Sequence, residues 1–207
     1  MKALRVLALA AMAAVPITAT AQQVAPPLKY ETFTLPNGLR FIVHEDNSTP
    51  IVAVDVWYGE LAWSLRTDER VQVHERTNVR TLTPETIGGP VDLVVADVSF
   101  ISLGLVLPAL TGCAREDADL LPMVKPQFEV GRERLGAGGV VRDPEHRVQA
   151  VLKVATAAEA LGWGTAGVVA SPLPGPAGNV EFFLWLRRDA GPPQEADIRR
   201  AVEEGPQ

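Results

Sequence analysis

Residues 91–100 constrain the fold of this 207-residue chain more than any other segment. They are nearly all apolar or β-branched around Asp92 and Asp97, as expected of a strand buried on both faces. Strands of that kind are typical of parallel sheets covered by helices. The segment therefore predicts an α/β fold rather than a bundle or a sandwich.

The residues that follow Asp55 alternate between strand and helix patterns, which supports the same fold class. Asp143 has the position of an N-cap, Pro144 takes the first turn of the predicted helix, and Gly162 ends it. Apolar residues keep helical spacing on one face of this helix, namely Val148, Val151, Leu152, Ala155 and Leu161. The remaining predicted elements are a short helix over 60–66, a helix starting at 103–110, and strands over 71–75, 119–125, 168–170 and 180–186.

Three polar residues occupy positions where an α/β sheet places function. Asp97 interrupts an apolar strand near its carboxyl end, Lys125 follows a strand and precedes Pro126, and Glu181 opens the last apolar strand. Ligands of open α/β sheets gather at the carboxyl ends of strands, which suits the first two residues. A buried charge is costly unless it is paired, so an Asp–Lys pair that only ties two strands together is the alternative interpretation.

Composition excludes some classes of function. The net charge of −6 and the pI of about 5.1 give no overall attraction to nucleic acid, so RNA binding would need a local basic patch or another domain. The single cysteine, Cys113, allows no disulfide within the chain. The three histidines are too widely spaced to predict a metal site.

The first 21 residues have the pattern of a secretory signal peptide. Lys2 and Arg5 precede an apolar run over 6–15, and the small-x-small pattern of residues 19–21 predicts cleavage after Ala21. The run is too short for a comfortable membrane span, so no stable span is expected after cleavage. An uncleaved anchor or a buried helix is the alternative.

Residues 22–52 predict a short β segment after an exposed linker. Strands are expected over 30–35 and 39–43 around a Pro-Asn-Gly turn, and a third over 51–58. The sequence of residues 30–46 and 50–59 resembles the N-terminal part of the insulinase or pitrilysin family of exported zinc peptidases. That family carries an inverted His-x-x-Glu-His zinc motif, which this sequence lacks, so the resemblance implies no metal and no peptidase chemistry.

Residues 53–207 resemble the hemolysin A (TlyA) family of FtsJ-like enzymes, which methylate ribose 2′-hydroxyls of cytidines in ribosomal RNA with S-adenosylmethionine. Six blocks carry the resemblance in order. They begin at Asp55 (Asp-Val-x-Tyr-Gly-x-Leu-Ala-Trp-Ser-Leu-Arg), Glu75 (Glu-Arg-Thr-Asn-Val-Arg), Val95 (Val-Ala-Asp-Val-Ser-Phe-Ile-Ser), Val124 (Val-Lys-Pro-Gln-Phe-Glu), Gly138 (Gly-Gly-Val-Val-Arg-Asp-Pro) and Gly178 (Gly-Asn-Val-Glu-Phe-Phe-Leu).

The resemblance implies a site, a cofactor and a partner. Asp97, Lys125 and Glu181 match the last three members of a catalytic Lys-Asp-Lys-Glu tetrad. A lysine amine held by carboxylates can orient a ribose hydroxyl and accept its proton. Binding of S-adenosylmethionine is implied for Asp55, Asn78, Asp97 and Phe100. The implied partner is ribosomal RNA.

The sequence also departs from this family. The glycine-rich cofactor loop, the central first strand, the first tetrad lysine and the amino-terminal RNA-binding domain have no counterpart by motif. We therefore expect an incomplete Rossmann-like methyltransferase sheet with an N-terminal β-hairpin extension and a signal peptide, and a gap or a poorly packed hairpin between the strands at Asp55 and Asp97. The expected organisation is a signal peptide (1–21), a peptidase-like β segment (22–52), a truncated methyltransferase domain (53–190) and a polar tail (191–207).

Three hypotheses about function follow. The first is a methyltransferase family member whose activity is impaired. The second is an exported peptidase-like fragment that acts as a structural or binding module, and the third is a non-functional chimera joined at residues 53–59, which fit both families. The two resemblances predict different cellular locations, because a signal peptide predicts export whereas ribosomes are cytoplasmic.

Overall fold

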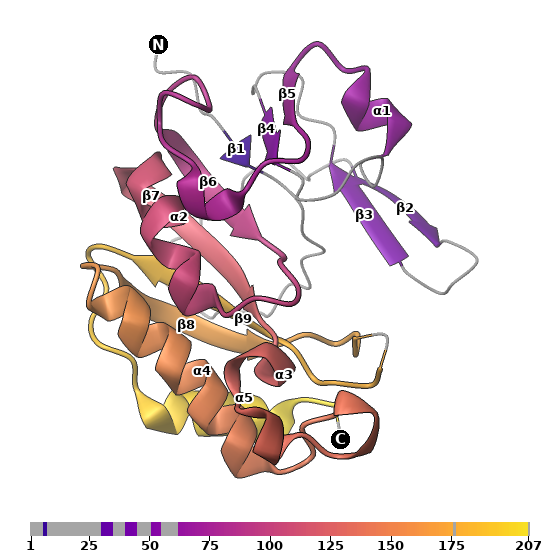
Figure 1. Ribbon diagram of the computed structural model, residues 1–207, viewed down its shortest axis with the longest axis vertical. Coiled ribbons are helices and arrows are strands. Elements are labelled where there is room, and N and C mark those ends of the chain that lie inside the picture. Colours follow the sequence, from indigo (N-terminus) through magenta and orange to yellow (C-terminus); the bar gives the residue numbers. More distant parts are fainter. Residues whose placement is uncertain are drawn as a thin grey trace, which may run out of the picture.

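The computed structural model describes residues 6–7, 30–34, 40–44, 51–54, 62–175 and 177–206. Its main feature is a seven-stranded sheet, ordered β5-β4-β1-β6-β7-β9-β8 (Figure 1). The strands are β5 (Val71–His74), β4 (Ile51–Val54), β1 (Val6–Leu7), β6 (Val91–Ala96), β7 (Ala114–Val124), β9 (Phe182–Arg187) and β8 (Gly164–Ala170). Strands β5 to β7 are mutually parallel, and β9 runs antiparallel to both β7 and β8. The predicted α/β class is confirmed.

Strand β1 corrects the prediction of an incomplete sheet. Val6 pairs with Ile51 of β4 and with Leu93 of β6, and Leu7 pairs with Val94. The expected gap between β4 and β6 is therefore filled by a parallel strand. The physical reason is that both neighbours present backbone N–H and C=O groups that need partners, and an apolar dipeptide can supply them at the buried centre of a sheet.

Strands β2 (Tyr30–Thr34) and β3 (Arg40–His44) form a separate antiparallel two-stranded sheet, drawn apart from the large sheet in Figure 1. Their register pairs Tyr30 with His44 and Thr34 with Arg40. The residues of the predicted turn between them lie outside the described residues, as do most residues of the predicted signal peptide.

Helices cover the carboxyl-terminal half of the sheet. Helix α4 (Pro144–Glu159) packs against β7, β8 and β9, and α5 (Glu195–Glu204) packs against β8 and α4. The shorter helices are α1 (Trp63–Arg66), α2 (Leu107–Cys113) and α3 (Pro126–Glu129), with 3₁₀ turns η1 (Val79–Thr81), η2 (Leu103–Leu105), η3 (Arg132–Arg134) and η4 (Ala137–Gly139). No helix among the described residues is long and apolar enough to cross a membrane.

The boundaries of α4 follow from its capping residues. The Asp143 carboxylate accepts a hydrogen bond from the Glu145 N–H at 2.9 Å, as predicted for an N-cap. The chain leaves the helix through Gly162, which has a φ of 81° that favours glycine. Val148, Val151 and Ala155 are buried, but Leu161 is 36% exposed because helical spacing ends at Glu159.

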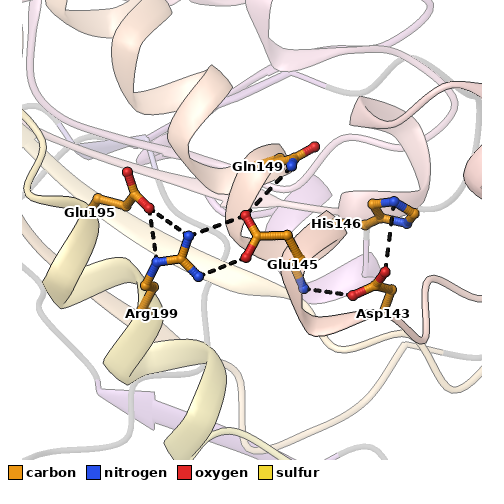
Figure 2. A network of polar contacts seen from close by, with 6 residues as sticks. All are labelled: Asp143, Glu145, His146, Gln149, Glu195 and Arg199. Atoms are coloured by element: carbon orange, nitrogen blue, oxygen red, sulfur yellow. Dashed lines mark hydrogen bonds and ion pairs between the residues drawn. The ribbon is translucent and has the colours of Figure 1, made fainter.

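Helix α5 was not predicted, because residues 191–207 read as a polar tail. Its Ile198, Ala201 and Val202 are buried, which explains how a mostly charged helix docks. On its exposed face the Arg199 guanidinium donates hydrogen bonds to Glu145 of α4 at 2.7 and 3.2 Å (Figure 2). These bonds lower the pKa of Glu145. An exposed pair of this kind contributes little stability, so the docking depends on the apolar face.

Three strands, β6, β7 and β8, differ in length from the prediction, and β8 begins at Gly164 rather than at residue 168. Strand β6 ends at Ala96 rather than at residue 100, and Phe100 adopts a left-handed φ of 64°, which is incompatible with a strand that continues through it. Strand β7 begins at Ala114 rather than at 119, through an irregular register next to Val91. Pairing between β7 and β9 is interrupted between Leu120 and Met123, where Pro122 has no N–H to donate.

The central position of β1 generates a test. Removal of residues 1–21, as signal-peptide cleavage would do, should lower the free energy of unfolding measured by urea denaturation. The reason is that backbone groups of β4 and β6 lose their partners, at about 1–3 kcal/mol for each buried group left unsatisfied. A chain with residues 12–21 replaced by a glycine–serine sequence keeps Val6 and Leu7 and is the control. An unchanged free energy in the deletion variant would contradict the placement of β1.

Candidate functional site

Sheet topology brings the three predicted site residues to one edge. Asp97 directly follows β6, and Lys125 directly follows β7, so the parallel pairing places both at the carboxyl ends of neighbouring strands. Glu181 directly precedes β9, which runs antiparallel to β7 and so begins at that same edge. Strand direction alone therefore accounts for their convergence.

The three side chains form one ionic cluster. Lys125 Nζ lies 2.7 Å from Asp97 Oδ1 and 3.9 Å from Glu181 Oε1. The lysine and Glu181 side chains are only 12% and 8% exposed, whereas that of Asp97 is 40% exposed. The arrangement places a cation between a buried and an accessible carboxylate. This geometry is consistent with the cluster that the family resemblance implies for these three residues.

Two further polar side chains join the cluster, and neither was predicted from the sequence. Lys125 Nζ donates a hydrogen bond to Ser99 Oγ at 3.0 Å, and Gln127 Nε2 lies 3.5 Å from Glu181 Oε1. Ser99 lies two residues after Asp97, and Gln127 two residues after Lys125. Both stand inside the blocks of family resemblance, which is the signal that could have identified them.

Burial controls the charge state of Glu181. Loss of solvent raises the pKa of its carboxyl group above the ordinary value, the positive charge of Lys125 lowers it, and the negative charge of Asp97 raises it. The hydrogen bond from Gln127 is the smallest contribution and lowers the pKa. Glu181 is thus a stronger proton acceptor than an exposed glutamate.

The loop before β9 encloses the Glu181 carboxylate. A Cβ atom at Gly175 would lie 2.7 Å from Glu181 Oε1, so a larger residue there would displace that oxygen. The Ser171 N–H donates to the Glu181 carbonyl oxygen at 2.7 Å, and the Gly175 N–H donates to the Asn179 carbonyl oxygen at 2.8 Å. These backbone contacts explain why a glycine-rich turn precedes the glutamate.

Asn179 connects two of the sequence blocks across the site. Its buried side chain accepts a hydrogen bond from the Val141 N–H at 2.9 Å and donates one to the Gly139 carbonyl at 3.1 Å. The buried Arg147 also donates to the Val141 carbonyl oxygen, at 2.9 Å. These hydrogen bonds therefore hold the loop over 138–143 beside Asn179, which precedes strand β9.

The structure places the predicted cofactor-binding residues in different surroundings. Asp55 lies outside the described residues. Asn78 follows the carboxyl end of β5, so it lies on the same sheet edge as Asp97, but its exposed side chain accepts from the Arg80 N–H at 3.1 Å and caps η1. Phe100 is 82% exposed, and its ring centroid lies 5.2 Å from that of Phe128. The cofactor roles of Asn78, Asp97 and Phe100 remain predictions.

A second buried carboxylate lies behind the cluster. Glu129, the last residue of α3, accepts hydrogen bonds from the Ser102 hydroxyl and the Leu103 N–H, both at 2.7 Å. Lys153 Nζ lies 3.2 Å from the same carboxylate. Glu129 was not among the site residues predicted from the sequence. Within the described residues, no group of three or more histidine, cysteine, aspartate or glutamate side chains could hold a metal ion.

Comparisons with known proteins agree with this fold. The FtsJ-like methyltransferase family matches residues 39–188, and the chain belongs to that family. The 16S/23S rRNA (cytidine-2'-O)-methyltransferase TlyA of Mycobacterium tuberculosis is 58% identical over 174 residues, which is 82% of this chain and 65% of the relative. The 23S rRNA (cytidine-2'-O)-methyltransferase TlyA of Campylobacter jejuni is 36% identical over 149 residues, 72% of this chain and 57% of the relative.

A solved structure of a candidate hemolysin from Lactococcus lactis is 38% identical, with a TM-score of 0.71, and the match covers 76% of this chain and 77% of that one. The chain thus spans about two thirds or less of the curated relatives' own length. The family match begins at residue 39, before the boundary at residue 53 that the sequence resemblance suggested.

The raised pKa of Glu181 predicts a measurable pH dependence. A carboxyl group whose pKa is higher in the folded chain binds its proton more tightly there, so its favourable contribution is present below the ordinary value of 4.5 and is lost as pH rises through the folded value. The stability of the wild type relative to Glu181→Gln should therefore increase as pH falls from 7 towards 4.5 in urea denaturation. Carbon-13 NMR of the Glu181 carboxyl should show the pKa rising further in Lys125→Met. A titration at or below 4.5 in both proteins would contradict the cluster.

Proposed function

We propose that this chain belongs to the branch of the FtsJ-like family that methylates a cytidine ribose 2′-hydroxyl of ribosomal RNA with S-adenosylmethionine. The observation that carries the proposal is the Lys125 amine held 2.7 Å from Asp97 and 3.9 Å from Glu181 at the carboxyl ends of β6 and β7. Relatives of 58% and 36% identity bear names with this activity, which supports the same choice of substrate.

The chemistry asked of the cluster is proton transfer and orientation. A ribose hydroxyl is a weak nucleophile, and the Lys125 amine can orient it and accept its proton as the new oxygen–carbon bond forms. Asp97 then stabilises the resulting ammonium ion at 2.7 Å, and the buried Glu181 supplies a second negative charge on the opposite side. Ser99 fixes the direction of the amine through the 3.0 Å hydrogen bond.

The cofactor, when bound, would supply an electrophilic methyl group carried on a sulfonium centre. Asp97, at the end of β6, and Asn78, after β5, lie on the sheet edge where such a ligand fits, and Asp55 and Phe100 complete the proposed set. The residues present fit the methionine portion of S-adenosylmethionine less well. The sequence has no glycine between Leu7 and Gly38, and hence no glycine-rich motif after β1 of the kind that lets a backbone approach a cofactor closely.

We infer from this difference that methyl transfer by the chain is impaired. The lack of a glycine-rich turn after β1 weakens cofactor binding, and no residue matches the first lysine of the tetrad by motif. We propose that this impairment arose when a peptidase-like segment was joined to a methyltransferase-like one. None of the contacts among the described residues favours the alternative of an exported binding module.

The proposal predicts weak cofactor binding and recoverable catalysis. Calorimetric titration of the purified chain with S-adenosylmethionine should give weak or no binding, and transfer of tritiated methyl groups to ribosomal subunits should stay at background. A graft that replaces residues 1–52 with the matching part of the Mycobacterium tuberculosis relative should restore both, because the acceptor side of the site is intact.

Lys125→Ala in the grafted protein should abolish methyl transfer, since it removes the proton acceptor. Arg115→Ala is the matched control, because Arg115 pairs with Asp92 near the opposite end of β7 and should leave the rate unchanged. Micromolar binding with Lys125-dependent methylation by the ungrafted chain would overturn the claim of impairment. A graft that binds the cofactor and keeps its rate after Lys125→Ala would overturn the proposed chemistry.

A further inference from the structure

Glu129 is the most enclosed carboxylate beside the site, and the proposed chemistry does not use it. The whole residue is 7% exposed and its side chain 1% exposed. A charge at that depth is costly without partners, and Glu129 has three. They are the Ser102 hydroxyl at 2.7 Å, the Leu103 N–H at 2.7 Å and Lys153 Nζ at 3.2 Å.

These partners belong to the loop that begins at Asp97 and to helix α4, while Glu129 itself belongs to the segment that follows Lys125. Ser102 and Leu103 end the loop that begins at Asp97, while Glu129 ends the single-turn helix that begins after Lys125. Lys125 contacts the first part of the Asp97 loop, through Asp97 and Ser99. Glu129 contacts the last part of the same loop, so the two loops are joined at both ends.

The hydrogen bonds of Glu129 also fix the directions of its partners. The Ser102 hydroxyl donates to Glu129 and accepts from the Gly104 N–H at 3.3 Å, so its rotation is determined. Lys153 of α4 donates to the Glu129 carbonyl oxygen at 2.8 Å as well as facing its carboxylate. Helix α3 has only four residues and could not hold its orientation through its own backbone bonds.

We propose that Glu129 is a positioning residue that sets the distance between Lys125 and Asp97. It acts through those two residues and does not touch the reacting atoms. Its importance for methyl transfer rests on the proposed function, but its effect on the Lys125–Asp97 pair can be measured without cofactor or RNA. The charge of Glu129, held by three partners from two elements, determines where α3 and the Asp97 loop meet.

A double-mutant cycle measures the effect directly. The variants Lys125→Met, Asp97→Asn and their combination are made in the full chain, with and without Glu129→Gln, and unfolding equilibrium constants are measured in urea. With Glu129 present, the Lys125–Asp97 coupling should change the unfolding constant roughly two- to tenfold, as is usual for contacting residues. With Glu129→Gln, the logarithm of that factor should fall by at least about half.

Controls separate positioning from general destabilisation. Thr111→Val removes hydrogen bonds from the Thr111 hydroxyl to the Leu107 and Pro108 carbonyl oxygens within α2, none of which involves Glu129 or its partners, and should leave the coupling unchanged. Ser102→Ala removes one Glu129 partner without leaving a buried charge alone, and should give a smaller loss of coupling. It decides the question if Glu129→Gln does not fold.

An unchanged coupling in Glu129→Gln and Ser102→Ala, with lower overall stability, would overturn the proposal and make Glu129 merely structural. The coupling is measured without methyl transfer, so the positioning role and the proposed function can be contradicted separately. A loss of coupling together with a grafted protein that fails to methylate would leave the positioning role standing and remove the proposed function. An unchanged coupling together with a grafted protein that methylates would remove the positioning role and leave the proposed function standing.

Discussion

The parallel pairing of β6 with β7 is the constraint on which the site depends. It aligns the two strand ends, so that Asp97 and Lys125 enter neighbouring loops at the same edge and meet at 2.7 Å. The reversed direction of β9 then adds Glu181 from the beginning of a strand rather than from its end. One backbone register thus collects three charges from positions 84 residues apart in the chain (181 − 97 = 84).

The energetics of the cluster oppose its burial. Glu181 is nearly enclosed, and desolvation raises its pKa although a lysine stands 3.9 Å away. An arrangement that favoured stability alone would replace such groups with apolar ones. The adjoining loops are restricted instead: Gly175 leaves room for the Glu181 carboxylate, Asn179 ties the loop over 138–143, and Glu129 ties the loop that ends at Leu103. Costly charges held in a restricted geometry are typical of functional sites, which is the reason for the proposed role.

The sequence predicted the sheet and the ionic cluster because polar residues that interrupt or flank apolar strands are conspicuous. It did not predict Ser99, Gln127 or Glu129, whose roles depend on the conformation of loops. The early end of β6 depends on the left-handed backbone of Phe100, which no periodicity reveals. Helix α5 was missed because only three of its residues are buried among charged ones. Strand β1 was missed because two apolar residues in a signal-like run also suit a central strand.

The central claim is that Lys125 lies between two carboxylates, and nitrogen-15 NMR of the lysine ammonium groups tests it most directly. The chain has four lysines, at positions 2, 29, 125 and 153. We expect the Lys125 Nζ resonance to shift as Glu181 takes up a proton on acidification, Glu181→Gln to remove that shift, and Asp97→Asn to displace the resonance at neutral pH by removing the contact at 2.7 Å. A Lys125 resonance that does not respond to acidification, or that responds equally in both variants and the wild type, would contradict it.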